Sequence, residues 1–406
     1  MKTSTSAHDR MKIALLNSYY YPEERGGAER SVRILAEGLV GLGHEVTVLA
    51  LGDAAAAPQS HNGVNIRRLS IRNAYLPSEV GGDVGAVSRL VWHARDSYNL
   101  GARADVRATL KASGAQVLHT NNLSGFSVAA WSAAHALGLP VVHTTRDFYL
   151  QCPRTTMMKG EHSCARPCGS CAPFAWPRRM VSQRIQHVVG ISRFMLERHQ
   201  QNDYFDGVPA SVIYNSYDGP AAPELRAPGA ELVLGFIGRL VPAKGVELLL
   251  QAFRRLHADA SQGALRLLIG GEGHPDYVAE LRRQAEGLPV DFLGHVNPPT
   301  FFPRVDVTVA PSVWNEPLGR VVIESMSFGK PVVVTPVGGM PELVAPGAGL
   351  VLPEVSADAL YASLADLLPA LRRDHASWAA KAREASLAYG AAAIAGQYQQ
   401  VYARYL

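Results

Sequence analysis

Apolar runs of strand length alternate with stretches of helical periodicity along almost the whole chain, and this alternation constrains the fold more than any other feature. Short apolar runs predict buried strands, and the amphipathic stretches between them predict crossover helices. Such alternation is typical of an α/β fold with parallel sheets. The predicted strands are Lys12–Asn17, Glu45–Ala50, Gln116–His119, Val141–Thr144, His187–Ile191, Leu232–Ile237, Leu265–Ile269, Val290–Leu293, Val307–Ala310 and Val332–Thr335.

The pattern restarts after Asn215–Ala230, a segment rich in Pro, Gly and Ala that has no periodicity and is typical of a connector. We therefore predict two Rossmann-like domains, residues 1–215 and 231–385, that face each other across a cleft. Ligands of open α/β sheets bind at the carboxyl ends of the strands. Tyrosines and alanines at helical spacing over residues 386–406 predict a C-terminal helix that packs back on the N-terminal domain.

Composition and charge exclude several classes of protein. With 47% hydrophobic and 18% charged residues, the chain does not have the composition of a disordered protein. No stretch approaches 18 apolar residues, and Met1–Arg10 lacks the apolar core of a secretory signal, so we expect a cytoplasmic protein. Residues 1–215 hold 23 Lys and Arg against 16 Asp and Glu, a net charge of +7. This excess of basic residues indicates a solvated face or a face that contacts an anionic membrane surface. Proteins that bind nucleic acid usually have a denser stripe of basic residues.

Three motifs place glycines and charged residues near strand ends. Gly26–Glu29 (GGAE) precedes a predicted helix, where backbone amides can approach a phosphate; a structural glycine pair is the alternative. Arg239 and Lys244 (GRLVPAKG) follow a strand and can flank a diphosphate, with a solvated turn as the alternative. Glu316 and Glu324 (NEPLGRVVIE) can accept hydrogen bonds from sugar hydroxyls, with two exposed helix carboxylates as the alternative.

In their order these motifs resemble the GT4 family of retaining glycosyltransferases, which have the GT-B fold. The resemblance also includes Gly270–Gly273, Phe292–Val296 and Gly338–Glu342, and it covers roughly residues 12–345. It implies transfer of a hexose-type sugar from a UDP- or GDP-sugar to a hydroxyl of a saccharide or lipid-linked glycan, in bacterial surface polysaccharide synthesis. No Asp-x-Asp pair occurs in the sequence, so we expect no catalytic cofactor or metal. A nucleotide-sugar epimerase and a non-catalytic nucleotide-sugar-binding protein remain alternatives.

The resemblance also implies roles for individual residues. The backbone around Gly294 to Val296 would lie along the edge of the nucleobase, and Glu324 would bind the ribose. The catalytic set would be Arg146, Arg239, Lys244 and Glu316. The donor-binding set would be Gly26, Gly27, Arg239, Lys244, Gly294, Val296, Glu316, Leu318, Gly319 and Glu324.

The chain departs from the family pattern after the strand Val141–Thr144. Many family members have a histidine where this sequence has Arg146-Asp147, so a catalytic histidine cannot be carried over. Three interpretations stay open: Arg146 acts on the donor sugar, Asp147 binds the acceptor, or the two side chains pair. His119 and Asn121 end the preceding strand on the predicted acceptor side, with buried structural side chains as the alternative.

A predicted insertion, residues 147–179, contains all four cysteines of the chain: Cys152, Cys164, Cys168 and Cys171. Their spacing is compatible with a structural zinc site or an iron–sulfur cluster, and free or paired thiols are the alternative. Arg178, Arg179 and Arg184 lie close to Trp176 in sequence, which suggests contact with anionic lipid headgroups at the inner face of the membrane. An internally paired basic cluster is the alternative.

Overall fold

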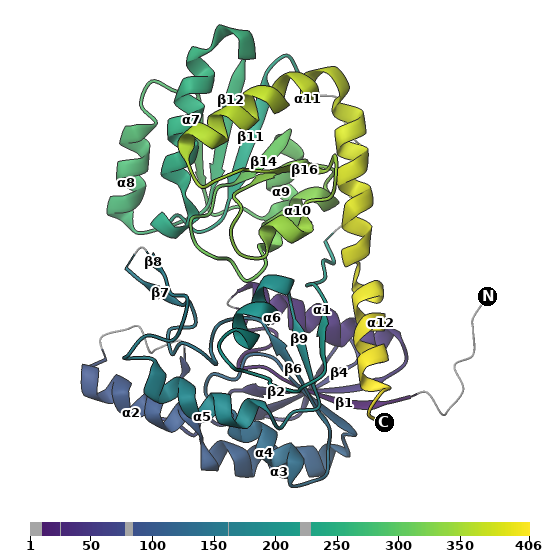
Figure 1. Cartoon of the computed structure of the whole chain (residues 1–406). Coiled ribbons are helices and arrows are strands. Elements are labelled where there is room, and N and C mark those ends of the chain that lie inside the picture. Colours follow the sequence, from purple (N-terminus) through teal and green to yellow (C-terminus); the bar gives the residue numbers. More distant parts are fainter. Residues whose placement is uncertain (1–9, 25, 78–83, 161, 220–228) are drawn as a thin grey trace, which may run out of the picture. The chain divides into compact units, whose positions relative to one another are not determined.

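The computed structural model describes residues 10–24, 26–77, 84–160, 162–219 and 229–406, which form two compact units. The first unit contains the described residues up to Lys159, Ser163–Ser216 and the C-terminal Ala391–Leu406. The second contains Tyr217–Gly390, together with the described residues of the short stretch Gly160–His162 (Figure 1). Residues 220–228 of the predicted connector and residues 1–9 lie outside the described residues.

The first unit is built on an eight-stranded sheet in the order β10-β9-β6-β5-β1-β2-β4-β3. All neighbouring strands are parallel except the pair β3 and β4. The strands are β1 Lys12–Leu16, β2 Glu45–Leu51, β3 Gln59–His61, β4 Val64–Leu69, β5 Val117–Thr120, β6 Val141–Thr145, β9 His187–Gly190 and β10 Ala210–Val212; β7 Met158–Lys159 and β8 His162–Ser163 form a separate pair.

Helices cover both faces of this sheet, as a parallel sheet requires (Figure 1). Successive side chains of β1 point to opposite faces. Ile13 and Leu15 pack with α1 and α12, whereas Ala14 and Leu16 pack with α3 and α4. These four apolar side chains are at most 1% exposed, and each fully buried leucine contributes roughly 1.5–3 kcal/mol. The helices are α1 Gly27–Gly41, α2 Ala86–Ser97, α3 Leu100–Ser113, α4 Ala129–His135, α5 Ala172–Ser182, α6 Arg193–Gln200 and α12 Ala391–Tyr402.

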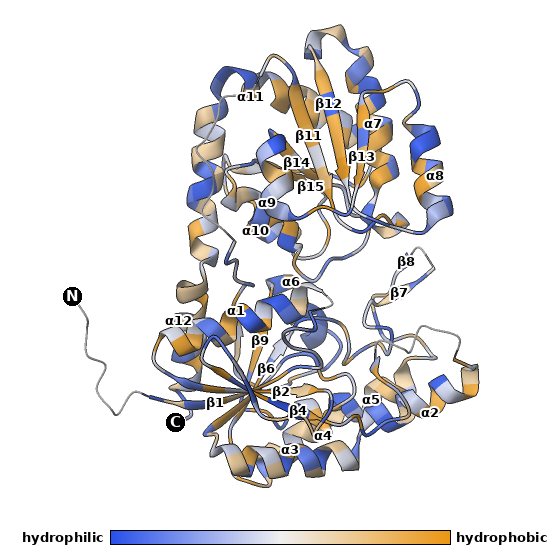
Figure 2. Ribbon diagram, turned by 180° about the vertical axis from the view of Figure 1, so that it is seen from behind, coloured by the Kyte–Doolittle hydropathy of each residue, from blue (hydrophilic) through white to orange (hydrophobic). Residues whose placement is uncertain are grey.

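The second unit contains a six-stranded parallel sheet in the order β13-β12-β11-β14-β15-β16. Its central strands are the most hydrophobic part of this unit (Figure 2). The strands are β11 Leu232–Ile237, β12 Leu265–Gly270, β13 Val290–Gly294, β14 Val307–Ala310, β15 Val332–Val334 and β16 Gly349–Val351. The α-helices are α7 Val246–Ala258, α8 Pro275–Gln284, α9 Pro298–Phe301, α10 Arg320–Ser327 and α11 Ala357–Ser386.

Each sheet contains one point at which the strand order reverses. In the first unit it lies between β5 and β1, and in the second between β11 and β14. Loops that leave such neighbouring strands turn to opposite faces, which opens a crevice at the carboxyl ends of the strands. The two parallel α/β domains predicted from the sequence are therefore confirmed, and each has its own candidate ligand position. Among the described residues, no helix combines the length and apolar composition that a membrane crossing needs.

Candidate active site

In the second unit, the switch point of the sheet places a cation beside a carboxylate. Lys244 ends the 3-10 helix Pro242–Lys244 after β11, and Glu316 lies in the loop after β14. The Lys244 Nζ forms an ion pair with Glu316 Oε1, and the two side chains are 21% and 11% exposed. Ser312 donates a 2.7 Å hydrogen bond to the same carboxylate oxygen. The pair therefore joins the two loops at the position where this sheet can bind a ligand.

Glycines allow these loops to approach closely. Gly245, immediately after Lys244, has φ +67°, and a Cβ there would lie 2.0 Å from the Pro311 carbonyl oxygen. A Cβ on Gly338 would lie 2.1 Å from the Glu316 carbonyl oxygen, which also accepts a 2.9 Å hydrogen bond from the Gly339 N–H. Any larger residue at these positions would displace backbone, so the Lys244–Glu316 geometry depends on glycine.

The other predicted donor residues of this unit lie on the same set of loops and on α10. Arg239 is exposed, and its guanidinium has no hydrogen-bond or ion-pair partner among the described residues. Gly319 begins α10 with φ +83°, directly after the buried Leu318. Glu324, one turn into α10, accepts a 3.1 Å hydrogen bond from Arg320. The structure thus brings Lys244 and Glu316 into contact, but it gives no contact that links either of them to Arg239 or Glu324.

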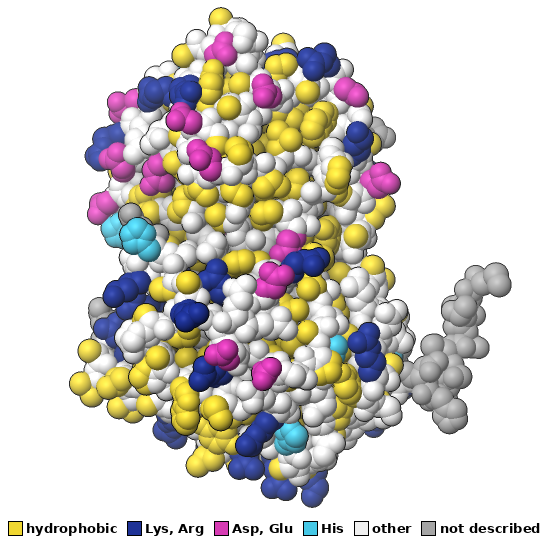
Figure 3. All heavy atoms as spheres, in the orientation of Figure 1, with side chains coloured by type: hydrophobic (Ala, Val, Ile, Leu, Met, Phe, Trp, Pro, Cys, Tyr) yellow, Lys and Arg dark blue, Asp and Glu magenta, His cyan; other side chains and the backbone are white. Residues whose placement is uncertain are grey.

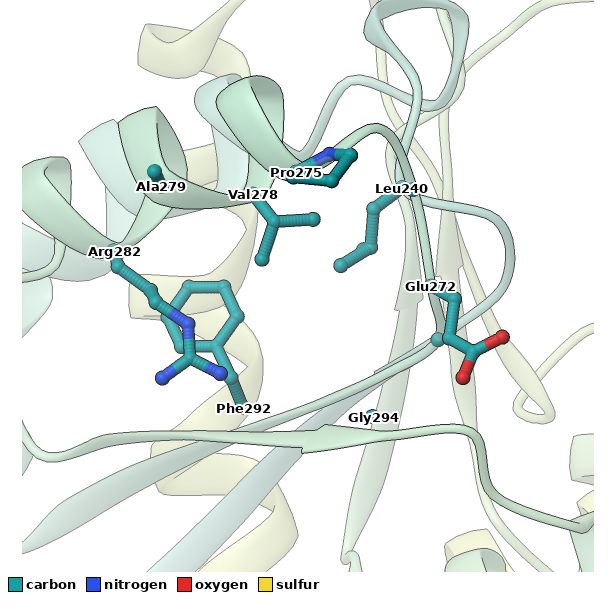
Figure 4. A pocket seen from close by; sticks show the side chains of 10 residues that line it. Leu240, Glu272, Pro275, Val278, Ala279, Arg282, Phe292 and Gly294 are labelled. Atoms are coloured by element: carbon teal, nitrogen blue, oxygen red, sulfur yellow. The ribbon is translucent and has the colours of Figure 1, made fainter.

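A pocket of about 380 Å³ opens at the ends of β11, β12 and β13 (Figure 4). Its wall includes Gly294, whose carbonyl oxygen accepts a 2.7 Å hydrogen bond from the N–H of Gly271. Leu240 and Val278 point toward one another across the pocket, and Arg282 lies over the Phe292 ring at 5.1 Å. Flat apolar walls with backbone groups at the edge suit a planar heterocycle. Val296, by contrast, packs its side chain against the neighbouring core.

In the first unit, the predicted phosphate-binding glycines begin α1. Gly26 is the N-cap residue and Gly27 the first helical residue, and both are exposed. The Glu29 carboxylate accepts hydrogen bonds from the N–H groups of Gly26 and of Glu29 itself, and the first of these is one half of a capping box. Burial raises the pKa of Glu29. The amides expected to receive a phosphate are therefore partly used by the chain's own carboxylate.

Arg146 follows β6 and is the centre of a buried hydrogen-bond network. Its Nε donates to Asn121 Oδ1 at 2.7 Å, and its Nη1 donates to Asn215 Oδ1 at 2.6 Å. Arg146 is only 7% exposed and Asn121 3%. Arg146 thus joins the segments that follow β5 and β6 to Asn215. A role of Arg146 at the donor sugar and of Asn121 at the acceptor stays a prediction.

The Asp147 carboxylate is held by hydrogen bonds to both of its oxygens. It accepts hydrogen bonds from Asn122 Nδ2 at 3.1 Å and from the Tyr149 N–H at 2.8 Å. Burial raises the pKa of Asp147 to about 6, and the negative charge of Glu29 adds to this increase. Two carboxylates with raised pKa values thus lie close together at the switch point of this unit, a pattern common at functional sites.

His119 is a structural residue, which corrects its predicted place on the acceptor side. It is fully buried, with Nδ1 2.7 Å from the Tyr402 hydroxyl and Nε2 2.7 Å from the Thr144 hydroxyl. Burial keeps the pKa of His119 well below its usual value. Both ring nitrogens are occupied, so no edge of the ring is available to a substrate.

Comparison with known proteins decides the family. The sequence profile of Glycosyltransferase Family 4 matches residues 25–218, and that of Glycosyl transferases group 1 matches residues 231–369. An uncharacterized 42.6 kDa protein from the cps region of Klebsiella pneumoniae is 33% identical over 334 residues, which cover 82% of this chain and 87% of that protein. The chain belongs to the family 4 glycosyltransferases.

Solved structures show the same fold for this glycosyltransferase. HepE of Anabaena, in complex with UDP and glucose, aligns with a TM-score of 0.67 and 20% identity over 97% of this chain and 100% of that one. Sucrose-phosphate synthase of Thermosynechococcus elongatus aligns with a TM-score of 0.70 and 21% identity over 97% and 99% of the two chains. At these identities the likeness establishes the GT-B fold alone.

The cysteines of this glycosyltransferase form a compact thiol group. Cys168 Sγ lies 3.4 Å from Cys171 Sγ, which lies 3.9 Å from Cys152 Sγ. All four cysteines, Cys164 included, are free thiols. Within the described ranges, no set of three or more His, Cys, Asp or Glu side chains is arranged to hold a metal ion, so the zinc and cluster alternatives gain no support.

The predicted basic cluster of the glycosyltransferase divides into two parts. Arg178 is fully buried and pairs with Asp96 at 3.5 Å, so its predicted contact with lipid headgroups is wrong. It also donates to the Tyr149 carbonyl oxygen, and it thereby fixes α5 to the body of the unit. Burial raises the pKa of Asp96 to about 7 despite this pair. Arg179 and Arg184 remain at the surface.

Proposed function

We propose that this glycosyltransferase moves a hexose-type sugar, with retention of configuration, from a UDP- or GDP-sugar to a hydroxyl of a saccharide or lipid-linked glycan. The contact between Lys244 and Glu316 at the switch point of the second sheet is the observation that carries this proposal. A cation there suits the diphosphate, and a carboxylate beside it suits hydroxyls of the sugar. The complex of HepE with UDP and glucose supports the donor class.

In this proposal the second unit binds the donor. Lys244 and the exposed Arg239 bind the diphosphate, and Glu316 orients the sugar together with the amides near Leu318 and Gly319. Glu324 binds the ribose by exchanging Arg320 for the two hydroxyls. The pocket beside Gly294 receives the nucleobase, whose plane matches its apolar walls.

The first unit supplies the acceptor side. Asp147 orients the acceptor hydroxyl, and Gly26 and Gly27 offer amides to the donor phosphates. The acceptor oxygen then bonds to the anomeric carbon on the face from which the phosphate departs, and the leaving phosphate oxygen takes the hydroxyl proton. Lys244 and Arg239 stabilise the negative charge that develops on the diphosphate. A role in bacterial surface polysaccharide synthesis is supported by the relative in the Klebsiella cps region.

The direct test is a thermal-shift screen of the full chain with UDP, GDP, ADP and their sugars, followed by a transfer assay with the donor that stabilises best. Ligands that bind only the folded state raise Tm. We expect one nucleoside diphosphate to stabilise the protein, and sugar release or transfer to continue in the presence of a chelator. Interconversion of the donor sugar without acceptor would favour the epimerase, and stabilisation without turnover would favour a pure binding protein.

A further inference from the structure

Helix α2 points an apolar face away from the protein. Val87, Leu90 and Val91 are 75%, 58% and 57% exposed, and their spacing places them on one side of the helix. The opposite side carries Trp92 and Asp96, both at most 2% exposed. An amphipathic helix normally buries its apolar side, so this face lacks a partner among the described residues.

Helix α5 extends the same surface. It is joined to α2 by the Arg178–Asp96 ion pair and by the rings of His93 and Phe174, whose centroids lie 5.8 Å apart. Trp176 and Met180, one turn apart on α5, are 59% and 50% exposed. The space-filling view shows hydrophobic side chains gathered over these helices, with Lys and Arg near them (Figure 3). We call Val87, Leu90, Val91, Trp176 and Met180 the α2/α5 face.

Arginines surround the α2/α5 face. Arg89 and Arg95 are exposed on α2. Arg166 and Arg179 line a pocket of about 340 Å³ together with Trp176, and the acid in its wall, Asp203, pairs with Arg179 at 3.0 Å.

Acids are almost absent from the chain around this face. Within residues 84–100 and 162–184 the one acidic side chain is Asp96, which is buried against Arg178. The potential is correspondingly positive. Burial, together with the charges of Arg178, Arg154 and Arg89, lowers the pKa of His93 on α2 to about 4.

We propose that the α2/α5 face docks on the surface of a bilayer that contains anionic lipids. Exposed aliphatic and Trp side chains enter the boundary between headgroups and acyl chains, and the surrounding arginines contact lipid phosphates. A symmetric dimer through this face would bring the two sets of arginines together, which like-charge repulsion disfavours. The inference rests on the proposed function, because a lipid-linked acceptor would be presented at such a surface.

The test is co-sedimentation of the full chain with phosphatidylcholine vesicles, with and without phosphatidylglycerol. We expect binding to the anionic vesicles that weakens as salt is added. The double variant Leu90→Ser/Trp176→Ser should lower the partition coefficient by at least about tenfold, because it removes the exposed apolar groups of both helices. The matched control is Leu387→Ser, because Leu387 is 70% exposed and lies outside the face.

The proposal is overturned if the wild type stays in solution with anionic vesicles, if the double variant binds like the control, or if the double variant instead abolishes a dimer seen in solution. Thermal shifts with nucleoside diphosphates, measured without lipid, separate this result from the proposed function. Normal nucleotide stabilisation without vesicle binding would refute the docking surface alone. Vesicle binding without nucleotide stabilisation would refute the donor site alone.

Discussion

Replacement of Lys244 tests the donor site most directly. In the free protein its ammonium group pairs with Glu316 Oε1, and Ser312 is the other described hydrogen-bond partner of that oxygen. Lys244→Ala removes the cation proposed to bind the diphosphate. It also leaves the Glu316 carboxylate, 11% exposed, without its counter-charge beside the position of the phosphates. Both effects weaken the binding of a nucleoside diphosphate.

The expected magnitude follows from the contacts. A hydrogen bond to a charged group contributes about 1.5–3 kcal/mol, and Lys244 is sufficiently buried for solvent to replace it poorly. We therefore expect Lys244→Ala to weaken binding by about 2 kcal/mol, which is roughly a 30-fold increase in Kd. Glu316→Gln should lower the Kd for the nucleoside diphosphate, because it removes the carboxylate that competes with the phosphates for the Lys244 ammonium group. The same variant should slow sugar transfer.

Isothermal titration calorimetry with the nucleoside diphosphate selected by the thermal-shift screen measures both effects. Lys381→Ala is the matched control, because Lys381 is an exposed lysine on α11 of the same unit. Circular dichroism establishes that each variant is folded. A Kd for Lys244→Ala within twofold of the wild type, with the fold intact, would remove Lys244 from the site and with it the main support for the proposed reaction.

Three further predictions concern the first unit. Because the pKa of Asp147 is raised to about 6, the free energy of unfolding should fall as the pH rises from about 4 through 6. The difference in Tm between Asp147→Asn and the wild type should therefore be more positive at pH 8 than at pH 4. His119→Ala removes two buried hydrogen bonds and should lower the free energy of unfolding by about 2–4 kcal/mol in urea titrations, with nucleotide affinity unchanged. Hydrogen bonds from Ser170 and Cys171 lower the pKa of Cys168 to about 7. Peptide mass spectrometry should therefore find Cys168 alkylated before the other cysteines, with a half-maximal rate near pH 7. Ser170→Ala should move the pH of the half-maximal rate upward.

Ten of the parallel strands could be predicted because each is a local pattern, whereas β4, β10 and β16 were not predicted. Buried strands such as β11 and β14 are apolar at almost every position and end at turn residues, so their predicted and observed bounds coincide: Leu232–Ile237 and Val307–Ala310. Helix α2 was not predicted, although its apolar side chains recur at helical spacing. Periodicity alone does not tell whether such a face is buried, and in α2 it is exposed.

The side-chain pairs of the candidate site could not be predicted in the same way. Lys244 and Glu316 are 72 residues apart, and Arg178 and Asp96 are 82 apart, so only the folded sheet brings them together. Strand ends do contain a usable signal: a cation after β11 and an acid after β14 meet if those strands are neighbours at a switch point. That neighbourhood depends on strand order, which local periodicity does not determine.

Except for Arg239, the charged groups proposed to bind the donor are already paired within the free protein. Lys244 holds Glu316, Arg320 holds Glu324, and Glu29 caps the amides of Gly26 and its own residue. At these paired groups a ligand must replace an existing partner. The binding free energy gained at each contact is therefore the difference between two similar interactions. A diphosphate alone pairs with Lys244 but leaves Glu316 without its counter-charge. A nucleotide sugar offers a phosphate to Lys244 and sugar hydroxyls to Glu316. This arrangement favours the intact donor over its nucleotide product, because the intact donor re-pairs both groups.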